Sequence, residues 1–109
     1  MARDQGLEEL VRAELEGIGG LTEKAMFGGL AWLQNGNLLC GARQDGMLVR
    51  LGKGNDGWAL ALPGVASMIM GERVMEGWVR AGPDAFGDDA VRRKLIAAAL
   101  GFVRELPAK

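Results

Sequence analysis

Two pairs of turn residues, Asn35-Gly36 and Asp45-Gly46, divide the middle of the chain into short apolar runs. Both central residues of a type I′ turn need positive φ, which Asn, Asp and Gly tolerate best, so each pair predicts a tight hairpin. The runs that flank these turns cover residues 30–33, 37–43 and 47–51. The pattern constrains the chain to an antiparallel meander, and we expect three or four strands between residues 22 and 51.

A helix is predicted at each end of the strand-forming part of the chain. Apolar residues recur at helical spacing over residues 7–18, where Asp4 is the expected N-cap and the carboxylates between Glu8 and Glu16 lie on the solvated face. A second helix is predicted over residues 88–106, with Asp88 as its N-cap. Its expected buried face comprises Val91, Leu95, Ala98, Ala99, Phe102, Val103 and Leu106. We expect its basic residues to lie on the other side: Arg92, Arg93, Lys94 and Arg104.

The segment between the meander and the last helix predicts three more elements. A glycine-rich loop over 52–57 leads into a short helix over 57–62, and strands follow over 66–70 and 74–81. The sequence therefore predicts an α+β fold, a two-layer α/β sandwich in which an antiparallel sheet of about five to six strands carries helices from both chain ends. We expect residues 1–109 to form a single domain, because their number is typical of one.

Composition narrows the classes of function. The apolar fraction of 49% and the charged fraction of 25% are those of a globular protein in water. Thirteen basic and fourteen acidic residues give a net charge of -1. A protein that coats nucleic acid needs an excess of basic residues, so we expect no nucleic-acid partner for this domain alone. Neither a signal peptide nor a membrane-spanning run is evident, so we expect a cytoplasmic location and no membrane partner.

Side chains commonly used for catalysis are scarce. The chain has no histidine and no tyrosine, and Cys40 is its only cysteine. This excludes Ser-His and Cys-His nucleophile pairs, imidazole metal sites and an intramolecular disulfide. Cys40 lies among apolar residues, with no neighbour to lower its pKa, and is expected to be a small buried side chain. We therefore expect no catalytic residue, no metal and no cofactor.

Two short runs carry a resemblance to a known family: Lys24-Ala25-Met26-Phe27-Gly28-Gly29 and Met75-Glu76-Gly77-Trp78-Val79. Together with the Asn35-Gly36 hairpin and the Ala-rich last helix, they resemble the N-terminal domain of TfoX-type proteins over residues 7–107. The resemblance implies a two-layer α/β module, associated with regulation of natural competence and without an established catalytic residue set. It marks as structural motif residues Met26, Phe27, Gly28, Gly29, Gly77 and Trp78. Longer members carry a second domain after this module, which we do not expect in a chain that ends at Lys109.

Basic residues on predicted strands form a candidate binding surface. Five lie in or beside these strands: Lys24, Arg43, Arg50, Arg73 and Arg80. If several share one face of the sheet, they would bind a carboxylate or phosphate. Alternatively, each is a solvated residue that protects the sheet from aggregation. The candidate anion- or partner-binding residues are Lys24, Arg50 and Arg73.

Two other patterns have structural interpretations. The glycines of the 52–57 loop match the spacing of a dinucleotide-binding fingerprint, but that site needs a βαβ unit with a substantial helix, so a flexible turn is the better interpretation. Aromatic side chains could stack on a ligand or base. We expect core packing for Phe27 and Trp78, and exposure for Trp58.

Two hypotheses of different class follow. The first is a non-catalytic regulatory module that acts through protein contacts, as a homodimer or with another protein, because an open sheet leaves edges or a face to cover. The alternative is a small-molecule or anion-binding domain that uses a basic patch on the sheet. An enzyme ranks third, since no nucleophile-base pair is present.

Overall fold

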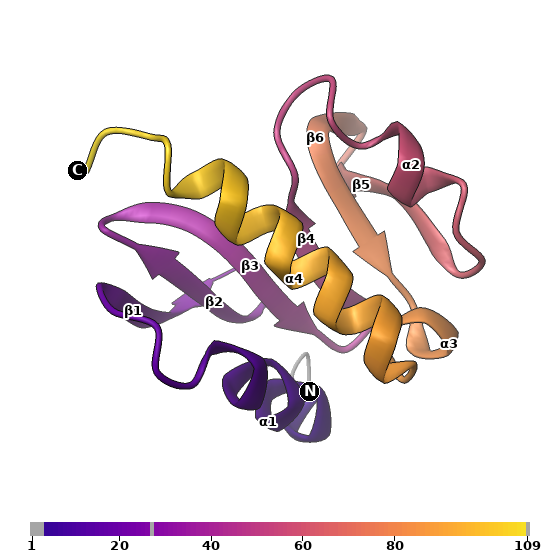
Figure 1. Cartoon of the computed structure of the whole chain (residues 1–109). Coiled ribbons are helices and arrows are strands. Elements are labelled where there is room, and N and C mark those ends of the chain that lie inside the picture. Colours follow the sequence, from indigo (N-terminus) through magenta and orange to yellow (C-terminus); the bar gives the residue numbers. More distant parts are fainter. Residues whose placement is uncertain (1–3, 27, 109) are drawn as a thin grey trace.

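The computed structural model describes residues 4–26 and 28–108, which form a six-stranded antiparallel sheet with helices on one face (Figure 1). The helices are α1 (Gln5–Leu15), α2 (Gly57–Leu60), α3 (Pro83–Phe86) and α4 (Asp89–Val103). The strands are β1 (Leu21–Met26), β2 (Gly29–Gln34), β3 (Asn37–Arg43), β4 (Gly46–Arg50), β5 (Val65–Met70) and β6 (Arg73–Ala81). In space they follow the order β1-β2-β3-β4-β6-β5, so β6 lies between β4 and β5. The predicted α+β class is confirmed.

The first four strands form the predicted meander. Asn35 and Gly36 both have positive φ, 51° and 84°, as the turn chemistry requires. Gly46 begins β4 with a φ of 145°, and its register partner in β3 is Arg43. The local turn signals therefore determine how this half of the sheet is connected.

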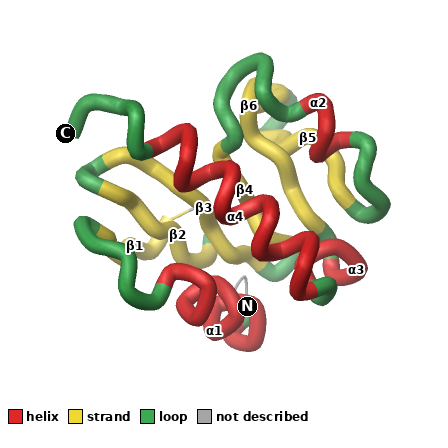
Figure 2. The backbone as a smooth tube through the Cα atoms, in the orientation of Figure 1, coloured by secondary structure: helices red, strands yellow, loops and turns green. Residues whose placement is uncertain are grey.

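Helices cover one face of the sheet, and α4 crosses it diagonally over β3 and β4 (Figure 2). Both long helices begin at the predicted caps: Asp4 accepts a hydrogen bond from the Leu7 amide, and Asp88 accepts from two amides of α4. All four helices contribute to one core, whose fully buried members include Val11, Val49, Ala59, Val79, Ala85, Leu95 and Ala99. None of the helices in the described part of the chain is long and apolar enough to cross a membrane.

A second, smaller core lies on the opposite face of the sheet, which we call the open face. Its buried members are Leu48, Met68 and Trp78. Three partly buried side chains pack against them: Leu38, Met70 and Met75. All six come from strands, and no described helix contributes to this cluster. The open face is therefore apolar without a helical layer over it.

The buried face of α4 differs from the predicted one. Its buried side chains are Arg92, Leu95, Ile96, Ala99, Leu100 and Val103. Arg92 was expected in water, yet it is only 6% exposed. Its guanidinium binds Glu14 of α1 at 3.1 Å, Asp89 at 2.8 Å and the Phe86 carbonyl at 2.8 Å. The prediction was wrong because α1 and α3 pack against this side of α4, which helical periodicity cannot reveal.

Two further expectations need correction. Glu8 was placed on a solvated face, but it is 1% exposed, and Glu14 is half-buried beside Arg92. No element is predicted between the strand over 74–81 and the helix over 88–106, whereas Pro83–Phe86 form the short helix α3. Pro83 occupies its first turn, where the missing amide costs nothing. Proline thus marks a helix start here and not merely the end of a strand.

Candidate binding surfaces

Arg50 occupies a special position at the end of β4. The register between β3 and β4 ends at Cys40 and Val49, so Arg50 has no backbone partner on β3. Its side chain takes that place: Nη1 donates a hydrogen bond to the Leu38 carbonyl at 3.2 Å. The guanidinium carbon lies 5.6 Å from the ring centroid of Phe102 on α4. The cation is thereby held at a fixed point between the open face and the last helix.

A pocket of about 380 Å³ lies on the open face beside this guanidinium. Its lining comprises Met26, Leu33, Gly36, Leu38, Arg50, Met68, Met75 and Trp78. Among the described residues of this lining, Arg50 is the single charged one. In the described part of the chain, no carboxylate forms an ion pair with Arg50. The site combines apolar walls with one half-buried cation, an arrangement suited to an apolar ligand with a negative group.

The other two candidate cations lie elsewhere. Lys24 is exposed on the edge strand β1, three strands from β4, which corresponds to roughly 14 Å across the sheet. Arg73 is exposed at the start of β6, where it lines a different pocket of about 480 Å³ with Val74, Met75 and Glu76. The structure therefore does not bring Lys24, Arg50 and Arg73 together.

The remaining strand arginines hold the β3–β4 turn. Arg43 forms two hydrogen bonds with the Asp45 carboxylate, both 2.8 Å long. Arg80 donates to the Asp45 carbonyl oxygen at 3.0 Å. These contacts give both residues a structural role at the turn.

The end of the β5–β6 hairpin exposes apolar side chains. β4 pairs with β6 only from Trp78 to Ala81, so in the described structure the first half of β6 pairs with β5 alone. Ile69 and Val74 are register partners there and are 54% and 55% exposed. Their neighbours along the strands, Met70 and Met75, pack on the open face, so Ile69 and Val74 point the other way. This exposed pair is a candidate contact surface.

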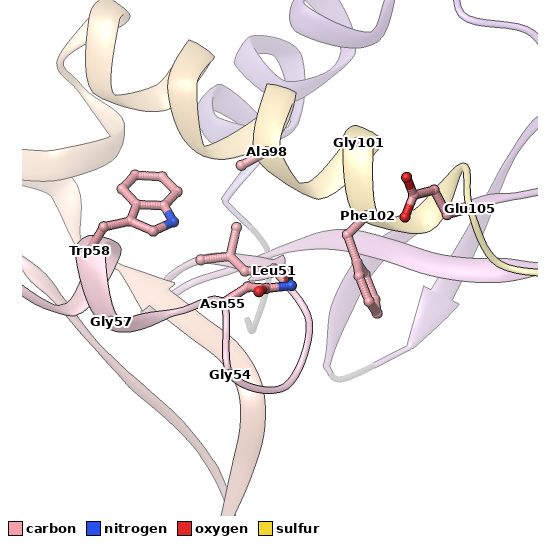
Figure 3. Close-up of a pocket in the computed structure, with 9 residues that line it drawn as sticks. All are labelled: Leu51, Gly54, Asn55, Gly57, Trp58, Ala98, Gly101, Phe102 and Glu105. Carbon is pink, nitrogen blue, oxygen red and sulfur yellow. Dashed lines mark hydrogen bonds between the residues drawn. The ribbon is translucent and has the colours of Figure 1, made fainter.

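A further pocket of about 580 Å³ lies between the 52–57 loop and the second half of α4 (Figure 3). Trp58 and Phe102 stand on opposite sides of Leu51 and Asn55 in this view. Trp58 is 37% exposed, as predicted, and its ring centroid lies 5.0 Å from Nζ of Lys94. The loop follows an antiparallel strand and leads into a helix of four residues, so the glycine spacing here lacks the βαβ setting of a dinucleotide site.

Cys40 is fully buried in the core, and burial raises the pKa of its thiol to about 12. At neutral pH it is therefore a thiol and not a reactive thiolate.

Glu23 accepts hydrogen bonds from Arg12 and from the indole of Trp32, which connects β1 and β2 to α1. Within residues 4–26 and 28–108, no three His, Cys, Asp or Glu side chains are grouped so as to hold a metal ion.

The sequence match agrees with this architecture. A family model described as the TfoX N-terminal domain matches residues 13–103 of the 109. The chain belongs to this family. Comparison of this TfoX N-terminal domain with curated proteins and with solved structures gave no match. The resemblance inferred from the two short runs is thus confirmed.

Most motif residues of the TfoX N-terminal domain have a visible structural reason. A Cβ on Gly29 would collide with the Ala42 carbonyl oxygen of β3, and Gly28 has a φ of 75°. Gly77 has a φ of 82° and lies against the backbone of the 52–57 loop. Trp78 is 7% exposed, as predicted, and Met26 lines the open-face pocket. Phe27 lies outside the described residues.

Sequence reasoning missed three features of the TfoX N-terminal domain that matter for binding. The exposed pair Ile69 and Val74 has the pattern of ordinary strand residues. The alternation of apolar residues does not show that the pairing of β4 with β6 stops at Trp78, before it reaches Val74. Phe102 was assigned to the core but also contacts Arg50. The Leu38 carbonyl that orients Arg50 carries no sequence signal, since any residue has one.

Proposed function

We propose that the chain is a non-catalytic regulatory module that acts through protein contacts and works as a homodimer in the cytoplasm. The family's association with control of natural competence makes regulation the class of function to propose. The observation that carries the proposal is the exposed pair Ile69 and Val74 at the end of the β5–β6 hairpin.

Two features of the hairpin support a contact role. A two-stranded hairpin is marginally stable in water unless another element covers it. Burying a valine or isoleucine side chain contributes about 1.5–3 kcal/mol, so covering both residues would stabilise this end of the sheet. A second copy is a suitable partner, because a two-fold interface pairs a patch with itself and an uncharged apolar patch does not repel its copy.

Two features of the side chains support a role without chemistry. The sequence has no histidine to act as a general base near neutral pH. Cys40, the one candidate thiol nucleophile, is buried and protonated. As the sole cysteine it cannot form an intramolecular disulfide, which supports a reducing compartment.

Light scattering coupled to size-exclusion chromatography tests the dimer with the Val74→Lys variant. The wild-type chain should show twice the chain mass at millimolar concentration, and Val74→Lys should show the single mass. Val74 is 55% exposed, so lysine there should leave the fold intact, which circular dichroism can check. The charge-matched control is Ala97→Lys on the exposed side of α4, which should remain dimeric. A wild-type monomer at millimolar concentration, or a dimer that persists in Val74→Lys, would refute this interface.

A second candidate function, the binding of a small anion, is favoured by Arg50 alone. Its guanidinium is fixed in an apolar pocket without an ion-pair partner among the described carboxylates. Lys24 and Arg73 do not line this pocket.

A further inference from the structure

We propose that the open-face pocket binds an apolar carboxylate of medium chain length, with Arg50 holding the carboxylate. The inference narrows the second candidate function to a ligand class and one site. It is independent of the dimer, because Ile69 and Val74 do not line this pocket.

The walls select an apolar ligand body. Leu48 and Met68 are fully buried beneath the open face, and Trp78 is 7% exposed. Leu33, Leu38 and Met75 add further apolar surface around the pocket. A ligand chain placed here leaves water and contacts carbon and sulfur on several sides, which provides the main driving force for binding.

Arg50 selects the ligand's charge. One of its five N–H groups donates to the Leu38 carbonyl, which leaves others to accept a carboxylate. A guanidinium matches a carboxylate in a two-bond geometry, and such charge-assisted bonds are the stronger ones. A neutral apolar ligand would instead cover this cation without supplying a counter-charge, which disfavours binding. A cationic ligand would face direct repulsion.

Size and adaptability favour a flexible chain over a rigid ring system. An apolar cavity of about 150 Å³ holds benzene. The pocket of about 380 Å³ therefore suits a chain of roughly eight to twelve carbons. Three of the lining residues are methionines, Met26, Met68 and Met75, whose unbranched side chains repack around ligands of variable shape.

The first test titrates the wild-type chain with decanoate below its micellar concentration. Decanol and decyltrimethylammonium serve as neutral and cationic probes of the same chain length. Calorimetry should give a dissociation constant for decanoate at least about tenfold below those of both controls, because only decanoate supplies a counter-charge to the Arg50 guanidinium and can accept two parallel bonds from it. Equal affinities for decanoate and decanol, or no binding of decanoate, would overturn the proposal.

Methionine methyl NMR locates the ligand without altering the protein. Decanoate should shift the methyl signals of Met68 and Met75, which line the pocket. Met47 is the internal control, since it is fully buried in the core on the helix-covered face and should not shift. Binding that shifts Met47 but neither pocket methionine would place the ligand elsewhere and refute the site.

Arg50→Gln tests the anchor, with Arg80→Gln as the matched control. Arg80 also binds a backbone carbonyl, at 3.0 Å, but does not line the pocket. Arg50→Gln should weaken decanoate binding about tenfold or more, whereas decanol should bind at least as tightly as it does to the wild-type chain. Arg80→Gln should retain wild-type affinity for decanoate. If Arg50→Gln binds decanoate as tightly as wild type, or if both variants weaken it equally, Arg50 is not the anchor. If Arg50→Gln does not fold, the titration of the wild-type chain with the three ligands and the methionine methyl shifts test the ligand class and the site.

Discussion

Replacing Gly77 with alanine should destabilise the domain by about 2–4 kcal/mol. The residue has a φ of 82°, and forcing alanine into the left-handed region costs about 1–2 kcal/mol. A Cβ there would lie 2.6 Å from both the Gly52 carbonyl carbon and the Lys53 amide nitrogen. These are backbone atoms held close because Leu51 donates to the Gly77 carbonyl at 2.7 Å and Gly52 does so at 3.1 Å. Relieving such an overlap adds about 1–3 kcal/mol.

Gly54→Ala separates strain from collision. Gly54 has a φ of 85°, but a Cβ there would meet nothing within 4 Å. Alanine also restricts the unfolded chain, which offsets about 0.4–1 kcal/mol in both variants. We therefore expect Gly54→Ala to cost only about 1 kcal/mol.

Urea denaturation followed by circular dichroism measures both losses. Small domains lose about 1–3 kcal/mol of stability per molar urea, so with a slope of about 2 kcal/mol per molar the midpoint should fall by about 1–2 M for Gly77→Ala and about 0.5 M for Gly54→Ala. If both variants lose the same stability, the close approach of the 52–57 loop to β6 does not constrain Gly77, and our explanation of this motif residue is wrong.

Two other predictions concern buried groups. Arg92→Ala should cost about 1.5–3 kcal/mol in the same urea assay, because the half-buried Glu14 loses its 3.1 Å partner and keeps Arg93 at 3.7 Å; a loss below about 1 kcal/mol would contradict the buried ion-pair interpretation. The pKa of Cys40 is raised from 9.0 to about 12, so above pH 9 the unfolded state loses a proton that the native state keeps. Stability should therefore fall with rising pH, by up to about 1.4 kcal/mol per pH unit between these values, and Cys40→Ala should abolish that slope. An unchanged slope in Cys40→Ala would assign it to other groups.

Local chemistry explains why much of the fold could be predicted. Positive φ at Asn35 and Gly36 is a property of those two residues, so the β2–β3 hairpin needs no distant information. Asp4 and Asp88 cap their helices through amides two or three positions away. Such signals determine where elements begin and how neighbours connect.

Long-range contacts explain what could not be predicted. Whether Arg92 faces water depends on its contact with Glu14 of α1, and these two residues are 78 positions apart in the sequence. Whether Arg50 lines a pocket depends on where the pairing of β3 with β4 stops and on Phe102 of α4. The sequence therefore named Arg50 as a candidate, but it could not separate Arg50 from Lys24 and Arg73.

The position of β6 between β4 and β5 has a consequence for how the sheet assembles. The other strand pairs in the described sheet join neighbours in sequence, whereas Arg50 and its register partner Trp78 are 28 positions apart. Closing such a stretch costs about 2 kcal/mol more chain entropy than closing a two-residue turn, at about 0.6 kcal/mol per doubling of loop length. The meander and the β5–β6 hairpin are thus two units of low contact order. Their docking along β4 is the step that should limit the folding rate.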